Sequence, residues 1–199
     1  MSICWKYHAR IDFKLGPMGS GKSAWLIGKY AELKGRKKIV KLISSVDKDG
    51  EVKSRIGLSV SAKIVPAGSL LQLLSDKEFF ADLNYIGIDE MQFYGKEELC
   101  SFCLEVLARN ISIIGCALDL DYRCQWWESI LSILKYADGF KKLTAPCQVC
   151  GAEAPFTGKF KHAGVDQLVE VGDIGKLYAP LCRSCYDKLA HEGAIYGRI

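Results

Sequence analysis

Short apolar runs alternate with longer segments of helical periodicity along the first two-thirds of the chain. The apolar runs predict strands over Ile11–Leu15, Lys38–Ile43, Tyr85–Glu90 and Ile111–Leu118. The periodic segments predict helices over Lys22–Leu33, Ser69–Leu74, Glu97–Arg109 and Trp127–Tyr136. Because strands that alternate with helices are typical of βαβ units, the pattern predicts an α/β fold, with a parallel sheet flanked by helices.

The pattern changes near Ala145-Pro146. From there to Ala190 the chain is rich in glycine, cysteine and short polar stretches. We therefore expect two units: a larger α/β domain over residues 1–144 and a smaller C-terminal domain over residues 145–199.

Composition narrows the class of protein. The chain has 199 residues, of which 49% are hydrophobic, and a net charge of +4. That charge suits anionic phosphates but is too small to indicate a nucleic-acid surface. No apolar run approaches the roughly 20 residues that span a bilayer, and the N-terminus lacks an apolar signal core. We expect a cytoplasmic protein without a membrane partner, in which nine cysteines serve as metal ligands or free thiols rather than disulfides.

A phosphate-binding loop follows the first predicted strand. Its residues are Gly16, Pro17, Met18, Gly19, Ser20, Gly21, Lys22 and Ser23. Glycines let backbone N–H groups point at phosphate oxygens, and the next helix adds its positive N-terminal end. At this spacing, Lys22 would contact the terminal phosphates and the Ser23 hydroxyl would bind Mg²⁺.

Two acids, Asp89 and Glu90, end the third predicted strand. Asp89 could hold Mg²⁺ beside Ser23, and Glu90 could accept a proton from an attacking hydroxyl. Alternatively, the two acids merely end a strand at the surface. The phosphate loop that precedes them favours the functional interpretation.

Two C-x-x-C pairs, 31 residues apart, predict a metal site. Four thiolates form a closed tetrahedral zinc site, so this zinc is expected to be structural, and a redox dithiol is less favoured. The predicted ligands are Cys147, Cys150, Cys182 and Cys185. Cys100 and Cys103 share the spacing but lie in an apolar helix, which indicates core or subunit-contact residues. Cys4, Cys116 and Cys124 carry no motif.

The 31-residue segment that the zinc closes contains several glycines and aromatic residues. The aromatic residues are Phe156, Phe160 and Tyr178, and the glycines are Gly151, Gly158, Gly164, Gly172 and Gly175. Long loops are usually functional, and glycine lets backbone groups approach a flat ligand such as a nucleobase. The alternative is a zinc ribbon that caps the domain or contacts another protein.

Several motifs, taken in order, resemble those of the type II thymidine kinases, a zinc-containing family. They are Gly16-Pro17-Met18 with Ser20-Gly21-Lys22-Ser23, Ser54-Arg55-Ile56-Gly57-Leu58, Asp89-Glu90-x-Gln92-Phe93, Leu118-Asp119-x-Asp121-Tyr122-Arg123, Cys147/Cys150 with Gly151, Ala154-x-Phe156-Thr157, and Tyr178 with Cys182-Arg183-x-Cys185. They cover residues 16 to 186.

The resemblance implies transfer of the γ-phosphoryl group of ATP to the 5′-hydroxyl of thymidine in nucleotide salvage, with deoxyuridine as a second candidate substrate. It implies that Glu90 is the catalytic base, that Lys22 and Ser23 bind phosphate and Mg²⁺, and that Asp89 assists. The implied thymine-pocket positions are Met18, Phe93, Leu118, Trp127, Thr157 and Tyr178. It further implies a zinc-closed lasso loop over the base, a homotetramer and feedback inhibition by thymidine triphosphate.

The chain departs from the family pattern in several places. The departures are Gly19, Asp47-Lys48-Asp49, Cys124-Gln125-Trp126-Trp127, Lys159 where arginine is usual, Gly172-Asp173 and Pro180. They leave open a regulator or degenerate relative that binds nucleotides without catalysis. A zinc-ribbon ATPase that binds nucleic acid is the least favoured alternative, because basic and aromatic residues form no dense patch.

Overall fold

The computed structural model describes residues 9–46, 49–161 and 175–197. Its centre is a six-stranded sheet in the order β5-β2-β6-β7-β1-β8, in which every neighbouring pair is parallel. The strands are β1 (Ile11–Leu15), β2 (Val40–Ser44), β5 (Lys63–Ile64), β6 (Tyr85–Asp89), β7 (Ser112–Ala117) and β8 (Gly139–Lys142). The predicted parallel α/β fold is confirmed.

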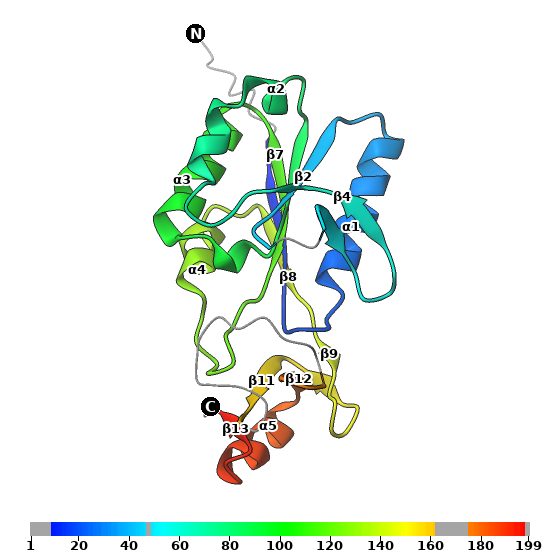
Figure 1. Cartoon of the computed structure of the whole chain (residues 1–199), viewed down its shortest axis with the longest axis vertical. Coiled ribbons are helices and arrows are strands. Elements are labelled where there is room, and N and C mark those ends of the chain that lie inside the picture. Colours follow the sequence, from blue (N-terminus) through cyan, green and yellow to red (C-terminus); the bar gives the residue numbers. More distant parts are fainter. Residues whose placement is uncertain (1–8, 47–48, 162–174, 198–199) are drawn as a thin grey trace.

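Helices cover both faces of the sheet (Figure 1). Helix α1 (Lys22–Gly35) packs on one face through Leu26, Ile27 and Leu33, against Leu42 and Ile114 of the strands. The other face carries α3 (Lys96–Ala108) and α4 (Glu128–Leu134), and its core includes residues of β1, β6 and β7. Among the described residues, no helix combines the length and apolar character that crossing a membrane would require.

Shorter elements connect the sheet strands. An antiparallel hairpin of β3 (Glu51–Lys53) and β4 (Ser59–Ser61) precedes β5, and α2 (Lys77–Phe80) precedes β6. The helix predicted over Ser69–Leu74 is instead a 3-10 helix, η1 (Leu71–Ser75), and a second one, η2 (Met91–Phe93), follows β6. The sequence did not predict β8 because Phe140, Lys141 and Lys142 are all exposed at the sheet edge and show no apolar alternation.

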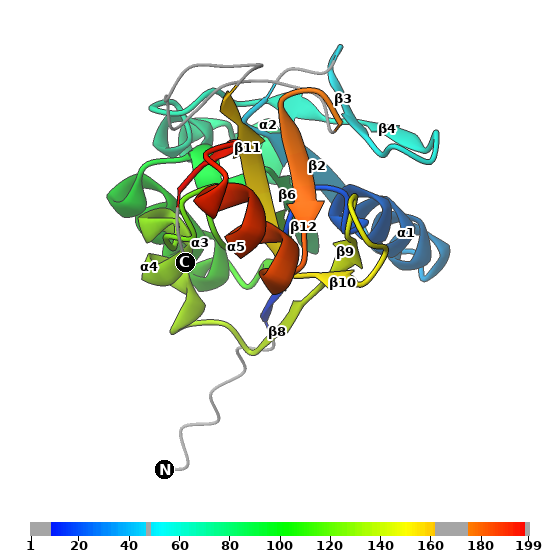
Figure 2. The ribbon, with the colours of Figure 1, turned by 90° about the horizontal axis from the view of Figure 1, so that it is seen from below.

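The C-terminal part of the chain forms small separate sheets beside one end of the large sheet (Figure 2). Strands β9 (Ala145–Pro146) and β10 (Glu153–Ala154) pair with each other, and β11 (Phe156–Phe160) lies between β12 (Tyr178–Leu181) and β13 (Ile195–Tyr196). Helix α5 (Arg183–His191) packs against β11 and β13, and it lies in front of β11 in Figure 2. A core centred on Phe156, Leu181, Tyr186 and Ile195 holds this part together, and Leu120 from the segment after β7 contributes to it.

The described parts of the segment between the cysteine pairs, residues 151–161 and 175–181, contain strands that the sequence did not predict. Phe156 is buried, with its ring centre 5.7 Å from that of Tyr186, so it packs within this unit and is not exposed to a ligand. Phe160 packs on the same core, and Gly158 serves close packing, because a Cβ there would lie 2.5 Å from Leu181. All three residues belong to β11 and serve packing, as the alternative of a zinc ribbon that caps the domain allows. Other residues named from the sequence lie outside the described ranges, namely Cys4, Asp47, Lys48, Gly164, Gly172 and Asp173.

Candidate active site and metal centre

The phosphate loop connects the carboxyl end of β1 to the N-terminus of α1. Gly21 caps that helix at φ 81°, a left-handed conformation that glycine adopts without strain. Gly16 lies so close to the chain after β8 that a Cβ would be 2.5 Å from the Leu143 carbonyl oxygen. The first turn of α1 has no acidic side chain and its N-cap makes no side-chain hydrogen bond. Its backbone N–H groups are thus available to an anion.

Lys22 folds back into this loop. Its Nζ donates to the carbonyl oxygens of Gly16, at 2.9 Å, and Pro17, at 2.7 Å. Removal of this ammonium group from water lowers its pKa, while the nearby Glu90 opposes the shift. The loop therefore surrounds a cation that can neutralise a phosphate group.

Asp89 and Ser23 meet at the edge of the sheet. Ser23 Oγ lies 3.3 Å and 3.5 Å from the two carboxylate oxygens of Asp89, which is buried at the end of β6. Hydroxyl and carboxylate oxygens are hard ligands of the kind that Mg²⁺ prefers. The donor set therefore fits a divalent cation bound with phosphates, as the motif spacing predicted.

Cys116, for which no role was predicted from the sequence, is part of the same cluster. The buried thiol on β7 lies 2.9 Å from Asp89 Oδ1. Burial, together with the Asp89 carboxylate, raises the pKa of Cys116 well above its usual value. The thiol therefore keeps its proton and donates to the carboxylate. No motif marks this residue, and only the pairing of β6 with β7 brings it to Asp89.

Glu90 follows in a left-handed conformation, at φ 54°, which turns the chain sharply out of β6. Its Oε2 accepts a hydrogen bond from Gln92 Nε2 at 2.8 Å, and Gln92 Oε1 accepts one from the Leu118 N–H at 3.1 Å. Gln92 is buried, whereas Glu90 is partly exposed. Gln92 belongs to a motif found in the sequence, but no role was predicted for it. Its side-chain amide connects Glu90 to the segment after β7.

Asp119 and Lys142 form an ion pair near this cluster. Lys142 Nζ, at the end of β8, lies 2.6 Å from the buried Asp119 Oδ2. The Asp119 carboxylate also opposes the pKa shift of Lys22, so it acts on the phosphate loop. Sequence motifs contained Asp119 but gave no signal for its partner, which lies on an unpredicted edge strand.

The six predicted nucleoside positions fall into two groups. The Met18 N–H donates to Thr157 Oγ1 at 3.0 Å, and Met18 packs against a small buried cluster that contains Tyr178. In the second group, the Phe93 and Trp127 rings meet edge to face, with their centres 5.8 Å apart. Leu118 is the third member, and its N–H donates to the side chain of Gln92, the residue before Phe93. Trp127 Nε1 is a buried donor that finds no acceptor among the residues that the structure describes.

The four predicted zinc ligands converge. The sulfur atoms of Cys147, Cys150, Cys182 and Cys185 all lie within 4.8 Å of one another, with the Cys150 and Cys182 sulfurs 3.6 Å apart. Sulfur atoms at the corners of a tetrahedral zinc site lie about 3.8 Å apart, given a Zn–S bond of about 2.3 Å. Burial opposes thiolate formation at Cys147, but N–H groups that include those of Cys182 and Cys150 hold its pKa at about 6. The cluster fits a zinc ion.

The two other cysteines with this spacing are core residues, as one of the two interpretations expected. Cys103 is buried in α3, and Cys100 Sγ lies 3.8 Å from the Ser132 carbonyl oxygen of α4.

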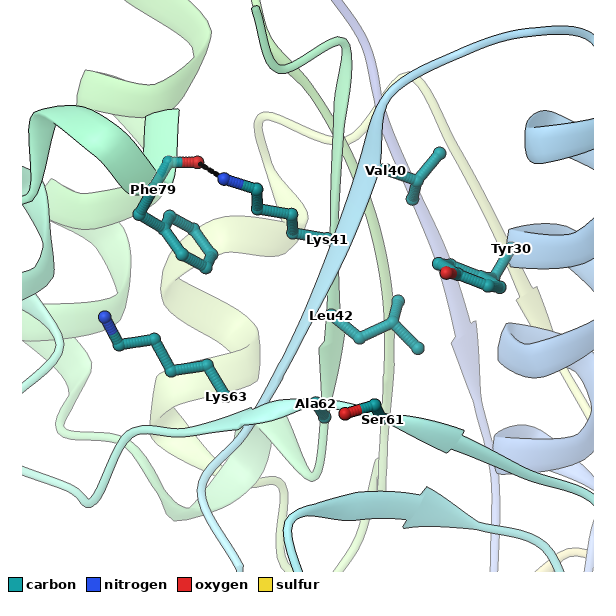
Figure 3. Close-up of a pocket in the computed structure, with 8 residues that line it drawn as sticks. All are labelled: Tyr30, Val40, Lys41, Leu42, Ser61, Ala62, Lys63 and Phe79. Atoms are coloured by element: carbon teal, nitrogen blue, oxygen red, sulfur yellow. Dashed lines mark hydrogen bonds between the residues drawn. The ribbon is translucent and has the colours of Figure 1, made fainter. Parts of the chain in front are cut away.

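A separate pocket of about 400 Å³ lies beside the first half of β2, away from the edge that carries Asp89. Figure 3 shows Lys41 and Lys63 near the Phe79 ring, with Tyr30 and Leu42 on the other side of the strand. Lys41 donates to the carbonyl oxygens of Glu78 and Phe79, and Lys63 pairs with Asp76. These lysines fasten α2 to the sheet, so we assign no ligand to the pocket.

Comparison with known proteins agrees with the geometry. The family model described as "Thymidine kinase" matches residues 9–186. The chain is 30% identical to a thymidine kinase of Choristoneura biennis entomopoxvirus, covering 89% of this chain and 96% of that protein. It is 35% identical to thymidine kinase a of Arabidopsis thaliana, over 86% and 72% of the two chains. It is 31% identical to a thymidine kinase of Ureaplasma urealyticum, over 87% and 80%. The chain belongs to the thymidine kinase family.

Proposed function

We propose that this protein is an ATP-dependent thymidine kinase, which transfers the γ-phosphoryl group of ATP to the 5′-hydroxyl of thymidine. The observation that carries the proposal is the convergence of the phosphate loop with Ser23, Asp89 and Glu90 at one edge of the sheet. Membership of the thymidine kinase family supports the choice of thymidine. The product, thymidine monophosphate, would enter nucleotide salvage.

Each group at this edge has a role in the proposed transfer. Residues Gly16 to Ser23 would bind the phosphates through backbone N–H groups, and Lys22 would neutralise charge that develops on the transferred group. Ser23 and Asp89 would hold Mg²⁺, which would neutralise negative charge on the phosphates. Glu90 would accept the proton of the 5′-hydroxyl as that oxygen attacks phosphorus. The hydrogen bond from Gln92 supports this assignment because it fixes the carboxylate of Glu90.

The nucleoside would bind between the two groups of pocket residues. Met18, Thr157 and Tyr178 would form one wall, and Phe93, Leu118 and Trp127 the other. The zinc-closed segment would act as the lasso that reads the base, and deoxyuridine is a second candidate substrate. A fixed pattern of backbone groups would reject cytosine, because reversed donors and acceptors leave buried groups unpaired at about 1–3 kcal/mol each.

The zinc would be structural. A site with four thiolates has no open position for a substrate, so its role would be to fasten both ends of the C-terminal unit. The core of that unit draws most of its residues from beyond residue 145, which supports a division into domains at residues 144 and 145, with Leu120 reaching across the boundary. We also infer a homotetramer, inhibition by thymidine triphosphate and a cytoplasmic location. The resemblance to the zinc-containing thymidine kinases supports these three inferences.

The direct test is to incubate the metal-replete protein with ATP, Mg²⁺ and thymidine, and to separate the products by chromatography. We expect thymidine monophosphate and ADP in equal amounts, less product with deoxyuridine and none with deoxycytidine. Absence of monophosphate would contradict the proposal. Thermal stabilisation by thymidine without turnover would identify the chain as a regulator that binds nucleotides.

A further inference from the structure

Lys159 has an unusual place for a cation. It is the fourth of the five residues of β11 and its exposed fraction is 0%. A buried charge costs free energy unless neighbouring groups compensate it. Lysine is rarely fully buried, so the surroundings of this residue indicate what it does.

Three tyrosines from separate segments surround the ammonium group. Lys159 Nζ lies 5.1 Å from the ring centre of Tyr122, 5.7 Å from that of Tyr178 and 5.9 Å from that of Tyr196. The strand register explains two of these contacts, because Lys159 pairs with Tyr178 of β12 on one side and with Tyr196 of β13 on the other. Cations are attracted to ring faces at such distances. We call these three residues the tyrosine cage.

The tyrosine cage continues directly to the phosphate loop. Tyr122 and Tyr178 belong to one buried cluster with Leu177, and Met18 of the loop packs against it. The Met18 N–H also donates to Thr157, two residues before Lys159 on the same strand. Lys159 thus lies close to rings from the segment after β7, from β12 and from β13. One of these rings, Tyr178, belongs to the wall that we assigned to the nucleoside, and the other two pack in the same cluster.

We propose that Lys159 is a positioning residue, which holds Tyr178 and Tyr122 in place as a wall for a pyrimidine nucleoside. This inference rests on the proposed function for the identity of the nucleoside. Lys159 itself need not touch the substrate, since it acts through Tyr178. A wall ordered before binding lowers the entropic cost of binding the nucleoside.

The test compares three lysine variants by steady-state kinetics. Lys159→Met keeps the length of the side chain but removes its charge, and we expect it to raise the KM for thymidine about tenfold. The KM for ATP and the kcat should change less than about threefold, because the phosphate loop stays intact. Lys159→Arg keeps the charge and should restore most of the affinity. Lys161→Met is the matched control, because Lys161 is an exposed lysine near the same strand and, of the three cage rings, its ammonium group is placed over that of Tyr196, at 5.7 Å.

A second variant can test the proposal even if Lys159→Met folds poorly. Tyr196→Leu leaves the lysine in place and removes one ring of the cage, so we expect a smaller rise in the KM for thymidine. Hydrogen exchange at the amides of β12 gives a readout that needs no activity. Exchange should be faster in Lys159→Met than in the wild type, and unchanged in Lys161→Met.

Two results would overturn the proposal. One is a Lys159→Met protein that melts at a lower temperature but whose KM for thymidine equals that of the wild type. This result would show that the cage has a purely structural role. The other is unchanged exchange in β12. A wild-type protein that does not phosphorylate thymidine would instead contradict the proposed function, and hydrogen exchange alone would then decide whether Lys159 orders Tyr178.

Discussion

Cys116 Sγ lies 2.9 Å from Asp89 Oδ1, so a buried thiol on β7 donates to the carboxylate that ends the neighbouring strand β6. Ser23 Oγ lies beside the same carboxylate, 3.3 Å from Oδ1. The thiol thus fixes the orientation of the group that we assign to Mg²⁺. Because the raised pKa keeps Cys116 protonated, this hydrogen bond persists at neutral pH.

Removing the thiol should weaken the binding of the Mg²⁺ that the reaction requires. We expect Cys116→Ala to raise the Mg²⁺ concentration at half-maximal activity about tenfold, since a hydrogen bond to a charged group contributes about 1.5–3 kcal/mol. Cys116→Ser supplies an O–H donor and should return the requirement to within about threefold of the wild type. Initial rates over a range of Mg²⁺ concentrations measure both effects. An unchanged Mg²⁺ requirement in Cys116→Ala would show that the thiol does not position Asp89.

Gln92 should contribute to stability as well as to activity. Gln92→Ala removes the acceptor of the Leu118 N–H and the donor to Glu90, so two hydrogen bonds of a buried side chain are lost. We expect the free energy of unfolding to fall by about 1–3 kcal/mol and kcat to fall with it. Urea denaturation measures the first effect. Gln125→Ala is the control, because Gln125 is exposed. If the two variants were equally stable, the bridging role of Gln92 would be refuted.

Zinc should be necessary for the C-terminal unit. We expect one zinc ion per chain by elemental analysis, and loss of the ion in Cys150→Ser. The melting temperature should then fall by about 10 °C, which for a chain of this size corresponds to roughly 3 kcal/mol. Cys100→Ser, which alters a cysteine of α3 outside the cluster, should keep the zinc. A metal-free wild-type protein with an undiminished melting temperature would rule out this site.

Trp127 offers a test of packing. Trp127→Phe keeps an aromatic ring against Phe93 and removes an N–H group that has no acceptor among the described residues. We expect the free energy of unfolding to stay the same or to rise by up to about 1 kcal/mol, because the cost of an unpaired buried donor disappears. Trp127→Ala should lose about 3–5 kcal/mol through the cavity that it leaves. A loss above about 1 kcal/mol in Trp127→Phe would show that the N–H group is satisfied.

The sequence predicted the parts of the site that follow from strand order. Ser23 comes after β1 and Asp89 ends β6, and because parallel strands end at one edge, their meeting could be expected from motif spacing. The four cysteines were predicted because their spacing is specific to metal sites. Helix and strand positions were correct where apolar periodicity was strong, as in α1 and β7.

Contacts between distant residues could not be predicted in this way. Cys116 reaches Asp89 only through the pairing of β6 with β7, and Lys142 reaches Asp119 from a strand whose exposed residues show no apolar pattern. The aromatic residues after Cys150 were assigned to a ligand because nothing in their composition distinguishes a binding loop from a strand. Phe156 packs on Tyr186 instead, since β11 buries it.

Phosphoryl transfer that depends on Glu90 is the central claim, and one paired measurement tests it most directly. Wild type and Glu90→Gln, both loaded with zinc, are compared for the rate of thymidine monophosphate formation at saturating ATP, Mg²⁺ and thymidine. We predict that Glu90→Gln loses about 10²–10⁴ in kcat while it binds thymidine with unchanged affinity by calorimetry, because the amide cannot accept the hydroxyl proton. A Glu90→Gln protein that forms the monophosphate at the wild-type rate would contradict the account.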